Sequence, residues 1–281
     1  MKLASYRVSG RASWGVVTGD EIADVGALLG DSCQDLKGWL AAPDQDLLGG
    51  ALPRAPRFSF NQVRLLPVIP NPAKIICVGH NYDAHRLETG RDTTSHPAVF
   101  IRFPDTQVAH GDTIRRPAVS GMLDYEGELA IVIGKAGRSI PAARAFDHVA
   151  GYTCFNDASI RDWQWHTSQF TPGKNFPGTG ASGPWLVTAD EIPDPRRLCV
   201  ETVLNGTVVQ KAPLSDMIFP IETLICYISA FTPLAPGDII CTGTPGGTGA
   251  KRQPPLWMKP GDRVEVAIRG IGRLVNGVEV A

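Results

Sequence analysis

Two glutamates, Glu126 and Glu128, stand two positions apart at the start of an apolar run that ends at Ile133. If this run is a β-strand, alternate side chains point to one face and the two carboxylates lie side by side. Carboxylates held together on a rigid element repel each other unless a cation lies between them, and a hard divalent cation suits oxygen ligands. An acidic strand face in contact with water is the alternative.

A third carboxylate, Asp157, follows a predicted strand over residues 151–156. Together with the two glutamates it could form a site that leaves open positions for water or substrate oxygens, which suits Mg²⁺ or Mn²⁺, with Ca²⁺ possible. The alternative role of Asp157 is to cap a short helix. That helix is expected to begin at Asn156 or Asp157 and to run through Arg161 and Gln164, because Asn and Asp favour the N-cap.

A candidate general base, His85, lies three residues before Glu88 in the segment that follows a predicted strand over 75–78. If this segment is helical, residues at i and i+3 can touch. A carboxylate beside an imidazole fixes its tautomer and raises its basicity, which makes a base that can activate water. A surface His–Glu pair would have the same spacing.

Two loops rich in glycine and proline offer further polar groups. The first, 173–176, carries Lys174. The second, 242–249, ends a predicted strand, and its backbone N–H groups and hydroxyls could hold a carboxylate. It is not a phosphate-binding P-loop, because the Gly-Lys-Ser/Thr ending is missing. A tight turn without a ligand is the alternative.

The framework that would position these residues is predicted to be mainly β. Asn205-Gly206 between apolar segments is a strong type I′ hairpin signal, and residues 221–231 carry apolar side chains at helical spacing. The long alternation of strands and helices that builds a doubly wound sheet is absent. Strands are predicted at 75–78, 129–133, 150–156, 199–204, 238–242 and 263–268, and further helices at 35–41 and 142–149. The fold class is therefore mixed, mainly β with a few helices.

The first 65 residues are predicted to form a small β-rich lobe. Strands at 3–8 and 13–18 would pair, and 21–25 would add a third. Prolines are dense just before residue 72, which favours an extended connector. A larger catalytic domain would then occupy residues 70–281.

Composition limits the class of protein. With 27 basic and 28 acidic residues the net charge is −1, and no basic patch stands out, so nucleic acid is not an expected partner. There is no apolar N-terminal leader and no run long enough to span a membrane, so no membrane association is expected. The six cysteines lack CxxC spacing and fit reduced thiols of a cytoplasmic protein.

Taken together, these stretches resemble the fumarylacetoacetate hydrolase family over about residues 70–281. The resemblance is carried by a series of motifs in the family's order. They are Gly-x-Asn-Tyr-x-x-His-x-x-Glu at 79–88, Pro-x-x-Phe at 97–100, Asp-Tyr-Glu-Gly-Glu-Leu at 124–129, Asn-Asp at 156–157, Arg-Asp-x-Gln at 161–164, Gly-Lys at 173–174, Asn-Gly at 205–206 and Thr-Gly-Thr-Pro at 242–245. The lobe before residue 70 matches only loosely.

The resemblance implies a β-roll fold, a homodimer, a small keto-acid substrate and a set of residue roles. The implied metal ligands for Mg²⁺ or Mn²⁺ are Glu126, Glu128 and Asp157. The implied water-activating dyad is His85–Glu88, on a lid that orders with substrate, while Gln164 and Lys174 would stabilise an oxyanion. Implied substrate contacts are Tyr82, Arg102 and Thr244, with Thr244 at the carboxylate end.

Two features depart from the family pattern or extend it. Arg102 stands where many members have lysine, and its planar fork would change the pocket there. The segment 163–183 is rich in aromatic residues, which favours either an apolar or bulky distal substrate group or ordinary core packing.

The resulting hypothesis is a metal-dependent hydrolase that cleaves a C–C bond in a 1,3-diketo acid such as an acylpyruvate, a fumarylpyruvate or a 2,4-diketo sugar acid. His85, oriented by Glu88, would take a proton from the attacking water, and Lys174 and Gln164 would stabilise the oxyanion. One alternative is decarboxylation or keto–enol tautomerisation of an oxaloacetate-like acid by the same enolate chemistry. A non-catalytic binding protein on the same scaffold is a more remote one.

Overall fold

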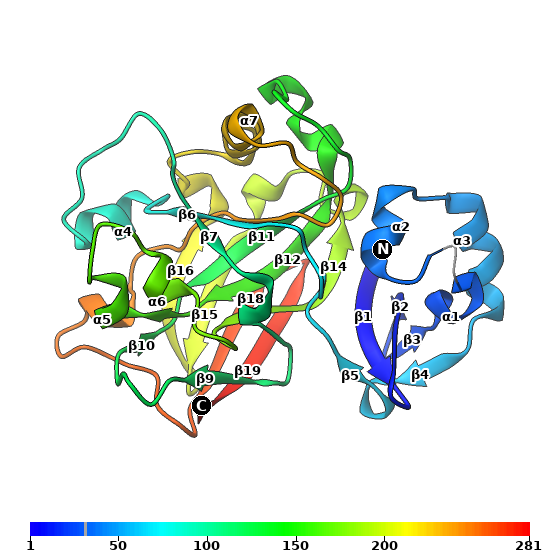
Figure 1. Ribbon diagram of the computed structural model, residues 1–281, viewed down its shortest axis with the longest axis horizontal. Helices are drawn as coiled ribbons and strands as arrows, with labels where there is room; N and C mark the ends of the chain where they lie inside the picture. Colours follow the sequence, from blue (N-terminus) through cyan, green and yellow to red (C-terminus); the bar gives the residue numbers. More distant parts are fainter. Residues whose placement is uncertain (31–32) are drawn as a thin grey trace.

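Two β-sheets form the frame of the protein (Figure 1). The computed structural model describes residues 1–30 and 33–281. The larger sheet has 12 strands, and its main path runs β4 (Arg57–Ser59), β3 (Glu21–Ala23), β2 (Arg11–Thr18), β1 (Lys2–Val8), β14 (Gly180–Thr188), β12 (Val149–Asp157), β11 (Gly127–Ile133), β17 (Ile239–Cys241), β6 (Ile75–Gly79), β7 (Ala98–Arg102). Beside this path, β5 (Arg64–Leu65) pairs with β1 and β8 (Gln107–Ala109) with β14.

The smaller sheet has five strands, in the order β16 (Thr207–Pro213), β15 (Cys199–Leu204), β18 (Arg263–Ile268), β19 (Gly272–Val280) and β9 (Thr113–Arg116). A two-stranded ladder joins β10 (Leu123–Asp124) to β13 (Ser159–Ile160). The helices are short: α1 (Val25–Leu29), α2 (Leu36–Ala41), α3 (Gln45–Ala51), α4 (Asp83–Glu88), α5 (Arg161–Gln164), α6 (Thr171–Lys174) and α7 (Ile221–Phe231). The predicted class, mainly β with a few helices, is confirmed.

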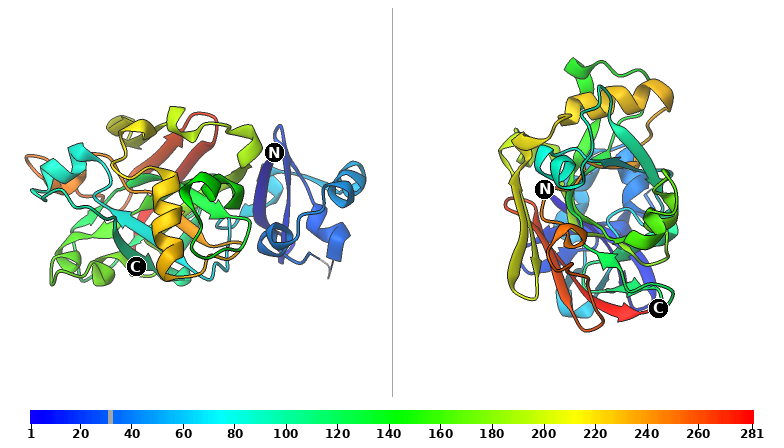
Figure 2. Two further views of the ribbon diagram at one scale, coloured as in Figure 1. Left: turned by 90° about the horizontal axis from the view of Figure 1, so that it is seen from above. Right: turned by 90° about the vertical axis from the view of Figure 1, so that its left-hand side faces the viewer.

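The strands at the centre of the larger sheet are apolar on both faces because both faces are covered. Leu129 and Ile131 of β11 belong to the main core, while Ala130 and Val132 of the same strand belong to a second core that also receives Trp14. This explains why β11 reads as a continuous apolar run in the sequence. α7 lies on the outer surface of the molecule (Figures 1 and 2).

β1 to β4 and α1 to α3 lie together at one end of the molecule (Figures 1 and 2). β1 and β2 pair antiparallel as predicted, and β1 also pairs with β14, with Leu3 opposite Leu186. These N-terminal strands therefore extend the same sheet that carries β11 and β12. The third predicted strand, 21–25, is shorter: it ends at Ala23, because the Asp24 side chain accepts a hydrogen bond from the Ala27 N–H and starts α1.

Two helix predictions need correction. The helix predicted to begin at Asn156 or Asp157 begins at Arg161 instead, because Asp157 is the last residue of β12 and pairs with Gly180 of β14. Residues 142–148 form a 3₁₀ helix where an α-helix was predicted. By contrast, α7 covers the predicted range, and the Asn205-Gly206 hairpin joins β15 to β16, with positive φ angles at both turn residues. In the described residues, no helix is long and apolar enough to cross a membrane.

Candidate active site

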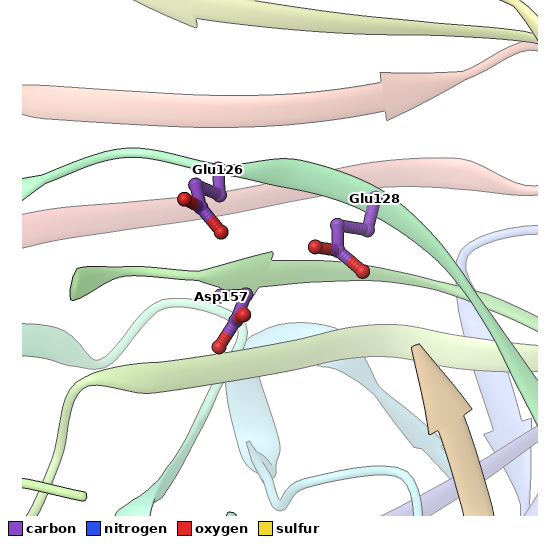
Figure 3. A group of neighbouring side chains, drawn as sticks. All are labelled: Glu126, Glu128 and Asp157. Atoms are coloured by element: carbon purple, nitrogen blue, oxygen red, sulfur yellow. The ribbon is translucent and has the colours of Figure 1, made fainter. Parts of the chain in front are cut away.

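The three predicted carboxylates meet at one end of the β11–β12 pair (Figure 3). Candidate ligand atoms of Glu126, Glu128 and Asp157 all lie within 4.8 Å of one another. The Asp157 N–H donates to the Glu126 carbonyl at 2.8 Å, so the antiparallel pairing itself brings the aspartate opposite the glutamates. All three residues are buried: Glu126 is 5% exposed, Glu128 1% and Asp157 0%. The sequence predicted that the two glutamates lie together, and the pairing of the strands adds Asp157 to them.

Only glycine fits between the two glutamates. A Cβ on Gly127 would lie 2.0 Å from Thr202 Oγ1 of β15 in the smaller sheet. The Glu126 N–H is held in turn by Asn156 Oδ1 at 3.0 Å. The close crossing of the two sheets therefore fixes the backbone from which both glutamates project.

Three cationic side chains balance part of this negative charge. Lys174 Nζ lies 2.6 Å from a carboxylate oxygen of Glu126 and 2.6 Å from one of Asp157. Arg161 lies 2.6 Å from the other Glu126 oxygen, and Arg102 lies 2.5 Å from the other Asp157 oxygen. The lysine is placed by α6, where a Cβ on its neighbour Gly173 would lie 2.5 Å from Gln164 of α5.

Glu128 is different, because in the described part of the chain no cationic side chain forms an ion pair with it. Among the described residues, its one hydrogen bond is from the Gly243 N–H to Oε2, at 2.8 Å. Burial, together with the charges of Asp157 and Glu126, raises the pKa of Glu128 well above its ordinary value. Burial acts the same way on Glu126, but Lys174 and Arg161 outweigh it and hold the pKa of Glu126 well below its ordinary value.

This arrangement fits a hard divalent cation. The donor set consists of carboxylate oxygens, and in the described part of the chain Glu128 lacks the cationic partner that Glu126 and Asp157 each have. Mg²⁺ and Mn²⁺ both favour oxygen ligands, and a buried carboxylate is costly unless it is paired. Glu126, Glu128 and Asp157 would hold the ion.

A small cavity of about 90 Å³ opens beside the carboxylates. This volume is small next to the roughly 300–1,000 Å³ of pockets for drug-sized ligands, so it favours a small substrate. Of the predicted site residues, the structure brings these to its wall: His85, Gln164, Lys174, Thr244, Glu126 and Glu128. Trp165 and Phe170 also line it, whereas Trp163 and Phe176 of the same aromatic segment pack edge to face and against the main core.

The predicted dyad is formed within α4. His85 Nδ1 lies 2.8 Å from Glu88 Oε1. The other Glu88 oxygen accepts the Gly247 N–H at 2.9 Å, and Thr248 Oγ1 donates to Oε1 at 3.0 Å. Burial alone would raise the pKa of Glu88, but the hydrogen bonds from His85 and Gly247 outweigh it and lower the pKa. Glu88 therefore stays ionised and orients the imidazole that lines the cavity.

The loop expected to hold a substrate carboxylate holds carboxylates of the protein itself. The Gly243 N–H binds Glu128, the Gly247 N–H binds Glu88, and the Gly249 N–H binds Asp124 at 2.8 Å. Asp124 in turn accepts from Arg161 Nε at 2.8 Å. The loop thus orients the base, one candidate metal ligand and the arginine that supports another.

Two predicted substrate contacts lie elsewhere. Arg102 is buried behind Asp157, where it donates to Thr179 Oγ1 at 2.6 Å as well as pairing with the carboxylate. Tyr82 is buried in the main core at the start of α4. Neither is among the described residues that line the cavity.

A second imidazole at the cavity was not singled out by the sequence. The His80 ring stacks on His85, with centroids 5.2 Å apart, and meets the edge of Phe170. Its backbone φ is +55°, an uncommon conformation for a residue other than glycine. Burial, followed by the charge of His85, lowers the pKa of His80 to about 4, so it is neutral at neutral pH. Its only sequence signal is its place in the 79–88 motif.

Gln210, also missed, ties the carboxylate strand to the 242–249 loop. Its Oε1 accepts the Gly127 N–H at 3.1 Å and the Thr202 hydroxyl at 2.8 Å. Its Nε2 donates to Thr244 Oγ1 at 2.8 Å and to the Pro245 carbonyl at 2.9 Å. No local pattern could have revealed this, because the partners are distant in sequence.

We expect Gln210→Leu to weaken Mn²⁺ binding about 10-fold, since groups that orient metal ligands typically contribute that much. Titration of the purified protein with Mn²⁺ measures it. Gln107→Leu is the matched control, because Gln107 also donates to a backbone carbonyl, that of Ile69, but outside the cavity. Equal loss of Mn²⁺ affinity in both variants would indicate general loosening and contradict a positioning role.

The sequence profile described as "Fumarylacetoacetate (FAA) hydrolase C-terminal" matches residues 74–279. The chain belongs to the fumarylacetoacetate hydrolase family. The resemblance seen in the sequence motifs is thereby confirmed, and the matched range contains the whole cavity wall described above.

Individual members of the fumarylacetoacetate hydrolase family give a finer comparison. "Oxaloacetate tautomerase YisK" of Bacillus subtilis (strain 168) is 43% identical over 249 residues, which are 87% of this chain and 81% of that protein. "Oxaloacetate tautomerase fahd2, mitochondrial" of Xenopus laevis is 43% identical over 222 residues, covering 78% of this chain and 70% of that protein. Among solved structures, maleylpyruvate hydrolase from Sphingobium sp. SYK-6, in complex with manganese(II) and pyruvate, has a TM-score of 0.84 and 32% identity, with 100% of both chains covered.

Proposed function

We propose that this enzyme interconverts the keto and enol forms of an oxaloacetate-type 2-keto acid, with a divalent metal ion at Glu126, Glu128 and Asp157. The observation that carries the choice of reaction is the 43% identity to a protein named oxaloacetate tautomerase over 87% of this chain. The cavity supports it, because buried carboxylates for a metal ion and an imidazole held by a carboxylate face the same small space. We therefore favour the tautomerase alternative over the hydrolase hypothesis that was drawn from the sequence.

Tautomerisation moves one proton from C3 to the oxygen on C2 and consumes no water. His85 is the group placed to carry it: a ring nitrogen accepts the C3 proton, and the resulting imidazolium returns a proton to the oxygen. Glu88 stabilises that imidazolium through the 2.8 Å contact at Nδ1. When bound, a divalent cation supplies positive charge that polarises the 2-keto group and makes the C3 proton more acidic.

Lys174 supports the same charge development. Burial alone would lower the pKa of Lys174, but the charges of Asp157 and Glu126 outweigh it and raise the pKa, so the ammonium stays protonated. An ammonium held in place at the cavity wall stabilises negative charge on a substrate oxygen without reorganisation.

The second candidate is the hydrolysis of a 1,3-diketo acid such as an acylpyruvate. The specific observation in its favour is the likeness to maleylpyruvate hydrolase in complex with manganese(II) and pyruvate. His85 would then remove a proton from water instead of from carbon, and the same residues would serve both reactions.

The deciding experiment follows the decay of the enol absorbance of freshly dissolved oxaloacetate, with Mg²⁺ or Mn²⁺ and with EDTA, alongside cleavage of acetylpyruvate and release of CO₂. Metal-dependent acceleration of enol decay, with little acetylpyruvate cleavage, supports the proposal. Rapid acetylpyruvate cleavage with no effect on enol decay would assign the hydrolase.

We expect His85→Asn to slow tautomerisation at least 100-fold, because it removes the proton carrier. The asparagine amide can still donate to Glu88, so the variant should keep the wild-type melting temperature and its increase with Mn²⁺. Unchanged turnover in this variant would exclude His85 as the proton carrier.

A further inference from the structure

Two cationic side chains that line the cavity, those of Arg91 and Lys251, have no partner among the described residues. In the described part of the chain, neither the Arg91 guanidinium nor the Lys251 ammonium takes part in a hydrogen bond or an ion pair, whereas Lys174 and Arg161 each bind buried carboxylates. Arg91 and Lys251 are exposed, and they therefore stand where the cavity meets solvent. Positive charge that no carboxylate of the described residues neutralises is available to an anionic ligand.

The backbone of Arg91 is fixed by the end of the helix that carries the dyad. α4 terminates in a Schellman motif: the Gly90 N–H donates to the Leu87 carbonyl and the Arg91 N–H to the Arg86 carbonyl, both at 3.1 Å. Gly90 has a φ of +68°, the left-handed conformation that this motif requires. Arg86 Nη1 donates back to the Arg91 carbonyl at 2.8 Å. Arg91 is thus anchored to the same helical unit as His85.

Arg91 stands at the boundary between two hollows. It lines the inner cavity, and it also lines an adjoining outer hollow of about 720 Å³ together with His80, Phe100 and Phe170. Glu126 and Glu128 line the inner cavity but not the outer hollow. The positive charge of Arg91 acts inside the inner cavity, because it adds to the effect of burial in lowering the pKa of His80. The inner cavity is therefore lined both by candidate metal ligands and by two cations that have no partner among the described residues.

We infer that Arg91 determines substrate specificity by pairing with the second carboxylate of a dicarboxylic 2-keto acid, with Lys251 of the same cavity wall adding positive charge. The inference rests on the proposed function for the keto-acid end of the ligand. A guanidinium offers two parallel N–H donors to a carboxylate, and such charge-assisted pairs are among the stronger hydrogen bonds in proteins. A monocarboxylic acid gains nothing from Arg91, so the cavity discriminates by charge at the distal end. This differs from the apolar distal group that the aromatic segment suggested, because Trp165 and Phe170 form the walls.

The test uses two unreactive 2-hydroxy acids, malate and 2-hydroxybutyrate, which differ in the distal carboxylate. Their binding to the Mn²⁺-loaded protein is measured by calorimetry. Wild type should bind malate more tightly, and Arg91→Gln should weaken malate binding about 10- to 100-fold while changing 2-hydroxybutyrate binding less than about twofold. Arg91→Lys should keep part of the preference. Arg138→Gln is the matched control, because Arg138 is also exposed and lies outside the cavity wall.

The inference is overturned if Arg91→Gln weakens both acids equally, if it leaves malate binding unchanged, or if wild type binds malate no more tightly than 2-hydroxybutyrate. Binding separates this result from the proposed reaction. If the protein binds malate through Arg91 but turns over no keto acid, the inference stands and the proposed tautomerase reaction is wrong. If the protein turns over oxaloacetate and Arg91→Gln leaves that turnover intact, the proposed reaction stands and the inference is wrong.

Discussion

Replacement of Lys174 by methionine is expected to destabilise the metal-free protein by about 3–5 kcal/mol and to lower turnover by a factor of about 100 to 1,000. Lys174 is 1% exposed and lies 2.6 Å from a carboxylate oxygen of both Glu126 and Asp157. Methionine has a similar length and volume, so the variant leaves no large cavity. What it leaves is two buried carboxylates with less compensating charge, which is the costly outcome of breaking a buried ion pair.

Denaturation by urea in EDTA and in excess Mg²⁺ measures this effect. Because a divalent cation can replace part of the lost positive charge, we expect Mg²⁺ to stabilise Lys174→Met by more than it stabilises wild type. Lys74→Met is the control, since Lys74 pairs with buried Asp238 at 2.8 Å outside the cavity. That variant should lose stability without any change in turnover or in the effect of Mg²⁺. If Lys174→Met were as stable as wild type in EDTA, the charge balance inferred for the site would be wrong.

The parts of this site that the sequence could predict are those written in local patterns. A period of two places Glu126 and Glu128 together at the start of an apolar strand, and a spacing of three places His85 beside Glu88 on one helix. The apolar spacing of residues 221–231 likewise predicts α7 over the range at which it is found. Each of these signals depends on neighbours a few residues apart, whose geometry is set by the secondary structure itself.

The parts that the sequence could not predict depend on contacts between distant segments. Asp157 extends a strand where its residue type favoured a helix cap, because β14 and Glu126 supply the pairing. Arg102 turns toward Asp157, and the 242–249 loop binds protein carboxylates where a substrate carboxylate was considered. The reaction is equally hard to predict from the sequence. Tautomerisation takes a proton from carbon and hydrolysis takes one from water, but both need the same imidazole, so the residues alone do not distinguish the two reactions.

Replacement of Glu128 by glutamine is expected to abolish both turnover and stabilisation by Mn²⁺ while leaving the metal-free protein at least as stable as wild type. The glutamine carbonyl can still accept the Gly243 N–H, which is the hydrogen bond that Glu128 makes in the described structure. The substitution removes a buried charge that lies beside two other carboxylates. Wild type should gain about 2.7 kcal/mol when Mn²⁺ is present at 100 times its dissociation constant, and the variant should gain little.

The pH dependence gives this prediction its sign. The pKa of Glu128 is raised in the folded protein, first by burial and then by Asp157 and Glu126, above the value of about 4.3 expected for an unfolded chain. A group of this kind favours folding below its unfolded pKa, and that contribution is lost as the pH rises toward the folded pKa. Metal-free wild type should therefore lose stability relative to Glu128→Gln from about pH 4.3 upward.

Melting temperatures measured in EDTA from pH 4 to pH 8 test this, with Glu265→Gln as the contrasting variant. Glu265 is also buried, but it is held by Arg263 and Arg273, so its neutralisation should lower the melting temperature with or without Mn²⁺. If Glu128→Gln behaved like Glu265→Gln in EDTA, Glu128 would have to be paired with a cation of the protein itself. The argument for a metal ion at this carboxylate would then fail, because that argument depends on a positive charge that residues 1–30 and 33–281 do not provide.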